Sequence, residues 1–182
     1  MKKLFLFDAM ALIYRAHFAF AKTPRISSKG INTSAVFGFA NTILEVIQKE
    51  KPDYLGVAFD TPAPTFRHVE YTPYKAQREK QPEDITIAIP YVKQFVEAMD
   101  IPILILDGYE ADDVIGTLAR QATEQKLEVV IATGDKDMAQ LVDEHVTLVN
   151  TMTNTVMDRD GVIEKFGIAP EQVVDYLALM GD

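Results

Sequence analysis

Acidic side chains recur directly after short apolar runs, and their spacing indicates metal-dependent chemistry on phosphate esters. Asp8 and Asp60 each follow one apolar run. Two denser groups follow the later runs: Glu110, Asp112 and Asp113 in the first, and Asp135 and Asp137 in the second. An all-oxygen set of ligands suits Mg²⁺ or Mn²⁺ better than Zn²⁺. Two groups of acids predict two ions, roughly 3.5–4 Å apart, as in two-metal phosphoryl-transfer sites.

Helix capping is the alternative interpretation of these acids. An Asp between a strand and a helix is a good N-cap, and acids in a first helical turn interact favourably with the helix dipole. For any one acid considered alone, capping is the simpler explanation. A cap explains one acid per junction, however, and does not explain Glu110, Asp112 and Asp113 together, or Asp135 with Asp137. Because so many carboxylates repel one another unless a cation offsets their charge, the whole pattern favours a metal site.

Other phosphate-binding and nucleophilic sites lack their residues in this sequence. There is no G-x-x-x-x-G-K-[ST] loop and no G-x-G-x-x-G after the first apolar run. Asp8 is followed by Ala9 and Met10, without the second Asp that an Asp-x-Asp phosphatase would use. The absence of cysteine excludes disulfides, thiolate zinc sites and thiol nucleophiles.

The apolar runs predict strands that would bring the acids together. Continuous apolar character is typical of strands buried on both faces, and it occurs over residues 3–7, 54–59, 102–106 and 127–132. A fifth run, residues 145–150, predicts an edge strand. Helical spacing predicts helices over residues 36–47, 114–122, 162–166 and 170–180, with a turn over residues 158–161.

Strands that alternate with helices predict an α/β fold with a mostly parallel central sheet flanked by helices. In such a sheet the carboxyl ends of the strands lie along one edge, where open α/β sheets bind their ligands. The acids at these ends should therefore converge in space.

A basic segment over residues 61–82 does not fit this alternation. It contains four prolines together with Arg67, His68, Lys75, Arg78 and Lys80, and it is too long for an ordinary connection. A solvated linker is one interpretation of the segment, and a functional loop is the other.

Length and composition limit the remaining possibilities. With 182 residues, 48% of them hydrophobic and 25% charged, the chain fits one globular domain. The net charge of −9 excludes a global basic surface for nucleic acid but allows a local one. Asp8 ends the first apolar run too early for a signal peptide, and no window approaches the ~20 apolar residues of a membrane helix. We therefore expect a soluble, cytoplasmic protein without membrane contacts.

Five motifs in order resemble those of the 5′ nuclease (flap endonuclease) family, and most of all the N-terminal 5′–3′ exonuclease domains of bacterial DNA polymerases I. The motifs are FDAMALIYR (7–15), FDTPAPTFR (59–67), YKAQR (74–78), GYEADD (108–113) and TGDKD (133–137). The resemblance covers essentially the whole chain, residues 1–182. It implies a PIN-like 5′ nuclease fold in which residues 61–82 begin a basic arch or clamp for the 5′ strand.

The resemblance also implies roles for individual residues. It makes Asp8, Asp60, Glu110 and Asp112 ligands of a first metal, and Asp113, Asp135 and Asp137 members of a second cluster. Lys75 and Arg78 match the basic pair that reaches the scissile phosphate, and Tyr14 matches an aromatic residue that stacks on a base. Further DNA contacts are expected from Arg15, Arg67 and Tyr74.

The implied function is hydrolysis of DNA at 5′ flaps, nicks and free 5′ ends, dependent on Mg²⁺ with Mn²⁺ as a substitute. The parent protein would be a DNA polymerase active in replication and repair, and the fragment itself a monomer. The family continues beyond the motif to which Asp182 belongs into a helix–hairpin–helix, so the sequence is expected to be a truncated piece. A PIN-like ribonuclease and a non-catalytic DNA-binding fragment are the alternatives.

Overall fold

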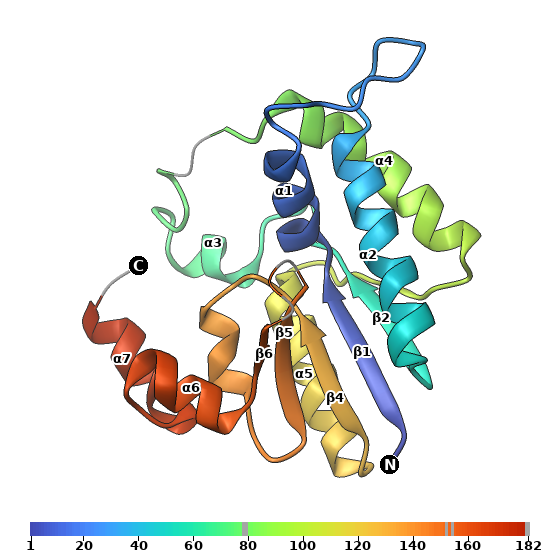
Figure 1. The fold of residues 1–182 in the computed structure, drawn as a ribbon. Coiled ribbons are helices and arrows are strands. Elements are labelled where there is room, and N and C mark those ends of the chain that lie inside the picture. The colour runs from blue at the N-terminus through green and yellow to red at the C-terminus, as the bar shows by residue number, and fades with distance from the viewer. Residues whose placement is uncertain (78–79, 152, 154, 181–182) are drawn as a thin grey trace.

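Parallel strands alternate with helices along most of the chain (Figure 1). The computed structural model describes residues 1–77, 80–151, 153 and 155–180. Within these residues one six-stranded sheet has the order β3-β2-β1-β4-β5-β6. The strands are β1 (Lys3–Asp8), β2 (Tyr54–Ala58), β3 (Ile103–Leu104), β4 (Glu128–Ala132), β5 (Val146–Asn150) and β6 (Thr155–Met157). All neighbouring pairs are parallel except β5 and β6.

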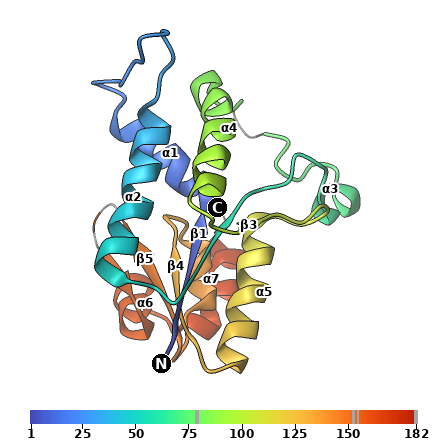
Figure 2. The same ribbon diagram turned by 90° about the vertical axis from the view of Figure 1, so that its right-hand side faces the viewer.

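Helices cover both faces of the sheet, with α2 and α5 on opposite sides of the strands (Figure 2). One layer contains α1 (Ala9–Ala19), α2 (Ser34–Glu50) and α4 (Glu83–Ala98). The other contains α5 (Ala111–Glu124), η1 (Asp137–Leu141), α6 (Arg159–Phe166), η2 (Pro170–Gln172) and α7 (Val173–Met180). A short helix, α3 (Phe66–Glu70), lies in the basic segment. In the described part of the chain, no helix has the length and apolar composition that crossing a membrane requires.

Strand β1 separates two hydrophobic cores. Phe7 packs with Phe39 in the core below α1, α2 and α4, whereas Leu6 packs with Ile115 in the core below α5. All four side chains are at most 1% exposed. Because successive side chains of a strand point to opposite faces, a strand buried on both sides must be apolar at every position. This explains the continuous apolar runs and confirms the predicted α/β architecture.

Three local predictions differ from the structure. Only Ile103–Leu104 of the predicted strand 102–106 forms β3. The predicted edge strand at residues 145–150 is an inner strand, because Thr155–Met157 pairs outside it as β6. The predicted turn at residues 158–161 is the beginning of α6, where Asp158 accepts a hydrogen bond from the Gly161 backbone as an N-cap.

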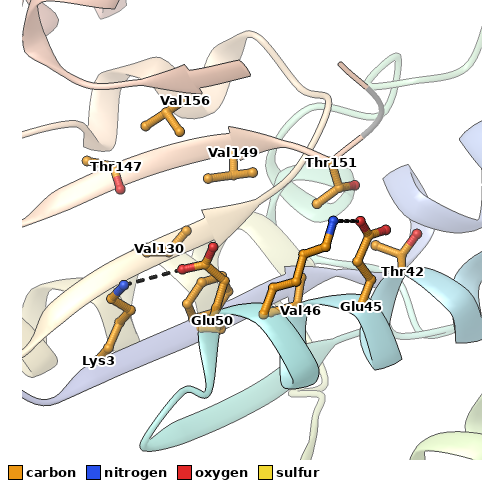
Figure 3. A pocket seen from close by; sticks show the side chains of 12 residues that line it. Lys3, Thr42, Glu45, Val46, Glu50, Val130, Thr147, Val149, Thr151 and Val156 are labelled. Carbon is orange, nitrogen blue, oxygen red and sulfur yellow. Dashed lines mark hydrogen bonds and ion pairs between the residues drawn. The ribbon is translucent and has the colours of Figure 1, made fainter. Parts of the chain in front are cut away.

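The α2 side of the sheet is hollowed next to β4, β5 and β6. A groove of about 330 Å³ lies between α2 and these strands, with Val130, Val149 and Val156 among its lining residues (Figure 3). Two ion pairs flank it, Lys3–Glu50 at 3.4 Å and Lys49–Glu45 at 2.5 Å. None of the predicted site acids lines this groove.

Candidate active site

The predicted acids meet at the carboxyl edge of the parallel strands. A cleft of about 640 Å³ is lined by Asp8, Asp60, Glu110, Asp112 and Asp135. Two further hollows of about 740 and 460 Å³ share Glu110 and Asp112 with this cleft. Asp137 lines both hollows, and Asp113 lines the smaller one. All seven predicted acids that the structure describes therefore border one continuous acidic region.

Helix caps hold two of these acids in place. Asp8 ends β1 and is the N-cap of α1, because its Oδ1 accepts from the Ala11 backbone N–H at 3.0 Å. Its Oδ2 accepts from the Thr133 hydroxyl at 3.0 Å. Asp60 Oδ1 accepts from the Ala111 backbone N–H at 2.9 Å, at the start of α5. Helix capping and a shared acidic site are thus not alternative roles for these two residues. The capping hydrogen bonds hold the same carboxylates that line the cleft.

Three acids at the start of α5, Glu110, Asp112 and Asp113, have different partners. Glu110 is the N-cap residue, and its backbone N–H donates to Asp113 Oδ2 at 3.0 Å. Arg67 donates through both terminal nitrogens to the Asp113 carboxylate, at 2.7 and 2.8 Å. These hydrogen bonds hold the pKa of Asp113 below its usual range. Asp113 was predicted as a metal ligand and Arg67 as a DNA contact, but the two side chains form an ion pair with each other. Asp112, by contrast, borders the cleft.

The basic segment reaches the cleft through two adjacent residues. Lys75 Nζ donates to Glu110 Oε1 at 2.6 Å, and the Tyr74 hydroxyl donates to Glu110 Oε2 at 3.0 Å. Lys75 has a left-handed backbone conformation, with φ of 56°. Burial, followed by the hydrogen bond to Glu110, raises the pKa of Tyr74. The basic segment is therefore in direct contact with one of the cleft acids.

Two of the cleft acids, Asp8 and Asp112, have a raised pKa. Burial raises the pKa of Asp8, and the charges of Asp60 and Asp135 add to this rise. Burial is also the first cause at Asp112, where the charges of Asp8, Asp135 and Asp60 help raise the pKa to about 7. A divalent cation in the cleft would offset this repulsion, and carboxylate oxygens are suitable ligands for Mg²⁺.

The carboxylates of the cleft therefore have the chemistry that a divalent cation requires. In this structure, however, two of the predicted metal ligands bind basic side chains instead. Among the described residues, no three His, Cys, Asp or Glu side chains stand in an arrangement that could hold a metal ion. Glu110 is instead bound by Lys75 and Tyr74, and Asp113 by Arg67. A cation bound by Glu110 would share this carboxylate with the positive charge of Lys75, 2.6 Å from its Oε1.

The remaining predicted residues divide into three groups. Tyr14 lines the acidic cleft, as expected for an aromatic residue near the site. Arg15 donates instead to the Thr42 hydroxyl at 2.7 Å and to the Thr151 hydroxyl, and burial lowers its pKa. Arg78 and Asp182 lie outside the described residues.

Sequence reasoning missed three polar residues of the cleft, Thr61, Gln81 and Lys93. Lys93 follows Ile89 by one helical turn, and both line the cleft from α4. The four-residue spacing could have predicted a helix that brings both side chains to the cleft. Pro90 lies between them, and a proline inside a segment argues against a helix.

We expect the metal-free protein to become less stable as Asp112 ionises. A carboxyl group with a folded-state pKa above its ordinary 3.8 contributes stability at low pH, and this is lost as pH rises through about 7. Asp112→Asn is uncharged at every pH, so in EDTA at pH 8 it should melt at least about 2 °C above the unaltered chain. The melting temperatures of the variant and the unaltered chain should differ less at pH 5, where Asp112 is largely protonated in the folded protein. Equal melting temperatures at pH 8, measured by circular dichroism, would contradict the expected repulsion.

The chain is similar in sequence to known 5′–3′ exonucleases and to DNA polymerases I. Residues 3–167 match the family described as "5'-3' exonuclease, N-terminal resolvase-like domain". A 5′–3′ exonuclease of Aquifex aeolicus is 43% identical over 182 residues, covering 100% of this chain and 62% of the relative. DNA polymerase I of Pseudomonas aeruginosa is 48% identical over 180 residues, covering 98% of this chain and 19% of the relative. The chain thus spans less than two thirds of either relative.

Solved structures share the fold. Bacteriophage T5 5′-exonuclease with bound divalent zinc superposes with a TM-score of 0.76 at 19% identity, covering 100% of this chain and 67% of the other. A complex of the T5 flap endonuclease with DNA and metal ions gives 0.74 at 19% identity, with the same coverage. These similarities confirm the PIN-like 5′ nuclease fold that the sequence motifs predicted.

Proposed function

The chain belongs to the family of 5′–3′ exonuclease N-terminal, resolvase-like domains, and from this premise we propose that it is a metal-dependent nuclease acting on 5′ ends and 5′ flaps of DNA. The observation that carries the proposal is the cleft in which five carboxylates lie beside Lys75. Two solved structures with this fold support it, because one contains divalent zinc and the other contains DNA and metal ions.

The acids divide into two sets of proposed metal ligands. Asp8, Asp60, Glu110 and Asp112 would hold a first Mg²⁺, and Asp113, Asp135 and Asp137 would contribute to a second, with Mn²⁺ as a substitute. Asp182 would extend the second set. The chemistry that such ions supply is Lewis acidity toward the phosphate and a lowered pKa of water.

The chain's own side chains would position the substrate. Lys75 would exchange Glu110 for the scissile phosphate, where a fixed positive charge stabilises the charge that develops during displacement. Arg78 would act beside it, and Tyr14, on the cleft wall, would stack on a base. Arg15 and Arg67 are engaged with other residues, so contacts from them to DNA would require rearrangement.

The proposal includes a role within a longer protein. We infer that residues 61–82 form the first part of an arch over the 5′ strand. The parent would carry fused polymerase domains and act in the cytoplasm during replication and repair, in primer removal and nick translation. The fragment itself would be a monomer.

A cleavage assay on matched substrates tests the function. We expect the chain to cut a 5′-flap DNA in the presence of Mg²⁺, to lose this activity in EDTA, and to leave an RNA hairpin of the same sequence intact. Preferential cleavage of the RNA would favour a PIN-like ribonuclease. Binding of the flap without cleavage at any Mg²⁺ or Mn²⁺ concentration would favour a non-catalytic DNA-binding fragment.

A further inference from the structure

Helix α4 presents one lysine to the acidic cleft. Ile85, Ala88, Val92 and Val96 are the buried residues of this helix and fix it against the hydrophobic core. Lys93 follows Val92 directly and lines the cleft together with Asp8, Asp60 and Asp112. The core packing of α4 therefore determines where the Lys93 side chain emerges.

An aromatic ring further fixes the Lys93 ammonium group. Lys93 Nζ lies 5.1 Å from the centroid of the Phe59 ring. Phe59 is only 2% exposed and immediately precedes Asp60, a cleft acid. A cation placed over an aromatic face at this distance is attracted to it, so the ring helps hold the Lys93 ammonium group in place at the cleft.

Lys93 differs from Lys75, the other lysine that lines the cleft, because in the described part of the chain only Lys75 forms an ion pair with a cleft carboxylate. Lys75 is bound to Glu110 at 2.6 Å, and a phosphate would have to compete with that carboxylate. Among the described residues, no carboxylate lies within ion-pair distance, 4.0 Å, of Lys93 Nζ. Lys93 can therefore bind an anion without first losing an ion pair.

A DNA strand that enters this cleft carries one negative charge per phosphate past five carboxylates. Cations along its path are needed to offset that repulsion. We infer that Lys93 binds a phosphate group of the substrate strand inside the cleft, next to the phosphate that Lys75 contacts. This inference rests on the proposed nuclease function and adds a second point of attachment, from α4, to the one from the basic segment.

The salt dependence of DNA binding tests the inference. Binding of a fluorescent 5′-flap DNA would be followed by anisotropy in EDTA, between about 50 and 200 mM salt. Lys93→Gln should weaken binding about tenfold and reduce the slope of log K against log salt by about 0.7, the value for one phosphate contact on a single strand. Lys93→Arg should retain the wild-type slope.

Lys49→Gln is the matched control, because it removes the same charge from α2, where Lys49 pairs with Glu45 outside the cleft. It should leave the slope unchanged. Circular dichroism melting would confirm that each variant is folded. A wild-type slope and affinity for Lys93→Gln, in a chain that cuts flap DNA, would overturn the inference and leave the nuclease function standing. A wild-type chain that neither binds nor cuts DNA would overturn both.

Discussion

Asp8→Asn is expected to reduce cleavage of a 5′-flap DNA in Mg²⁺ by about a thousandfold, equivalent to about 4 kcal/mol of transition-state stabilisation. The same variant should leave the fold intact. Asn caps a helix as well as Asp does, and its oxygen can still accept from the Ala11 backbone N–H. The Thr133 hydroxyl can accept from the new amide. The substitution therefore removes the negative charge and keeps the cap.

This variant separates the two roles that Asp8 has in the structure. Cleavage would be measured in single turnover, and unfolding by thermal melting in EDTA. Asp8→Ala is the companion variant, which should also lose about 1 kcal/mol of stability because the cap itself disappears. Near wild-type cleavage by Asp8→Asn would show that Asp8 is only a cap and would remove it from the proposed metal ligands.

Much of the fold and the convergence of the acids was predictable because both follow from strand burial. Strand β1 is apolar at every position from Leu4 to Phe7, and a charged residue, Asp8, is where it ends. Asp8 and Asp60 mark two such points, and neighbouring parallel strands end at one edge. The family membership was predictable for another reason, because five motifs in order are far more specific than any one of them.

The less predictable features depend on contacts between distant segments. The pairing of Arg67 with Asp113 joins residues 46 positions apart, and neither residue signals the other in the sequence. Arg15 similarly turns toward Thr42 and Thr151. Helix α4 was missed because Pro90 lies inside it, although four buried side chains hold it in place. Tertiary packing overrides local propensity in such a helix.

The exposed strand β6 was missed because it is short and its apolar pattern is weak. Only three residues, Thr155–Met157, pair with β5. Val156 is 58% exposed, so no burial pattern distinguishes this strand from a loop. Edge strands of this kind are defined by their backbone partners rather than by their own side chains.

Lys75→Ala should lower the single-turnover rate of flap cleavage about 100- to 1000-fold, the loss found when a preorganised group that stabilises developing charge is removed. Its effect on DNA affinity should be no more than about tenfold, because one phosphate contact is a small part of the total. The structure gives a reason for this difference. Lys75 Nζ is held 2.6 Å from Glu110 Oε1 at the cleft, so its charge lies beside the carboxylates that are proposed to bind the metal ions.

The rate and the affinity must therefore be measured separately. Single-turnover cleavage at saturating enzyme reports the rate, and anisotropy in EDTA reports the affinity. Lys75→Arg keeps the charge and should recover part of the rate, whereas Lys49→Ala, outside the cleft, should match the wild type in both measurements. If Lys75→Ala keeps both the wild-type rate and the wild-type affinity, its ion pair with Glu110 serves only to neutralise a cleft acid. If only the affinity falls and the rate at saturating enzyme is unchanged, Lys75 binds the ground state and the transition state equally well, and its charge does not act on the developing charge of the reaction.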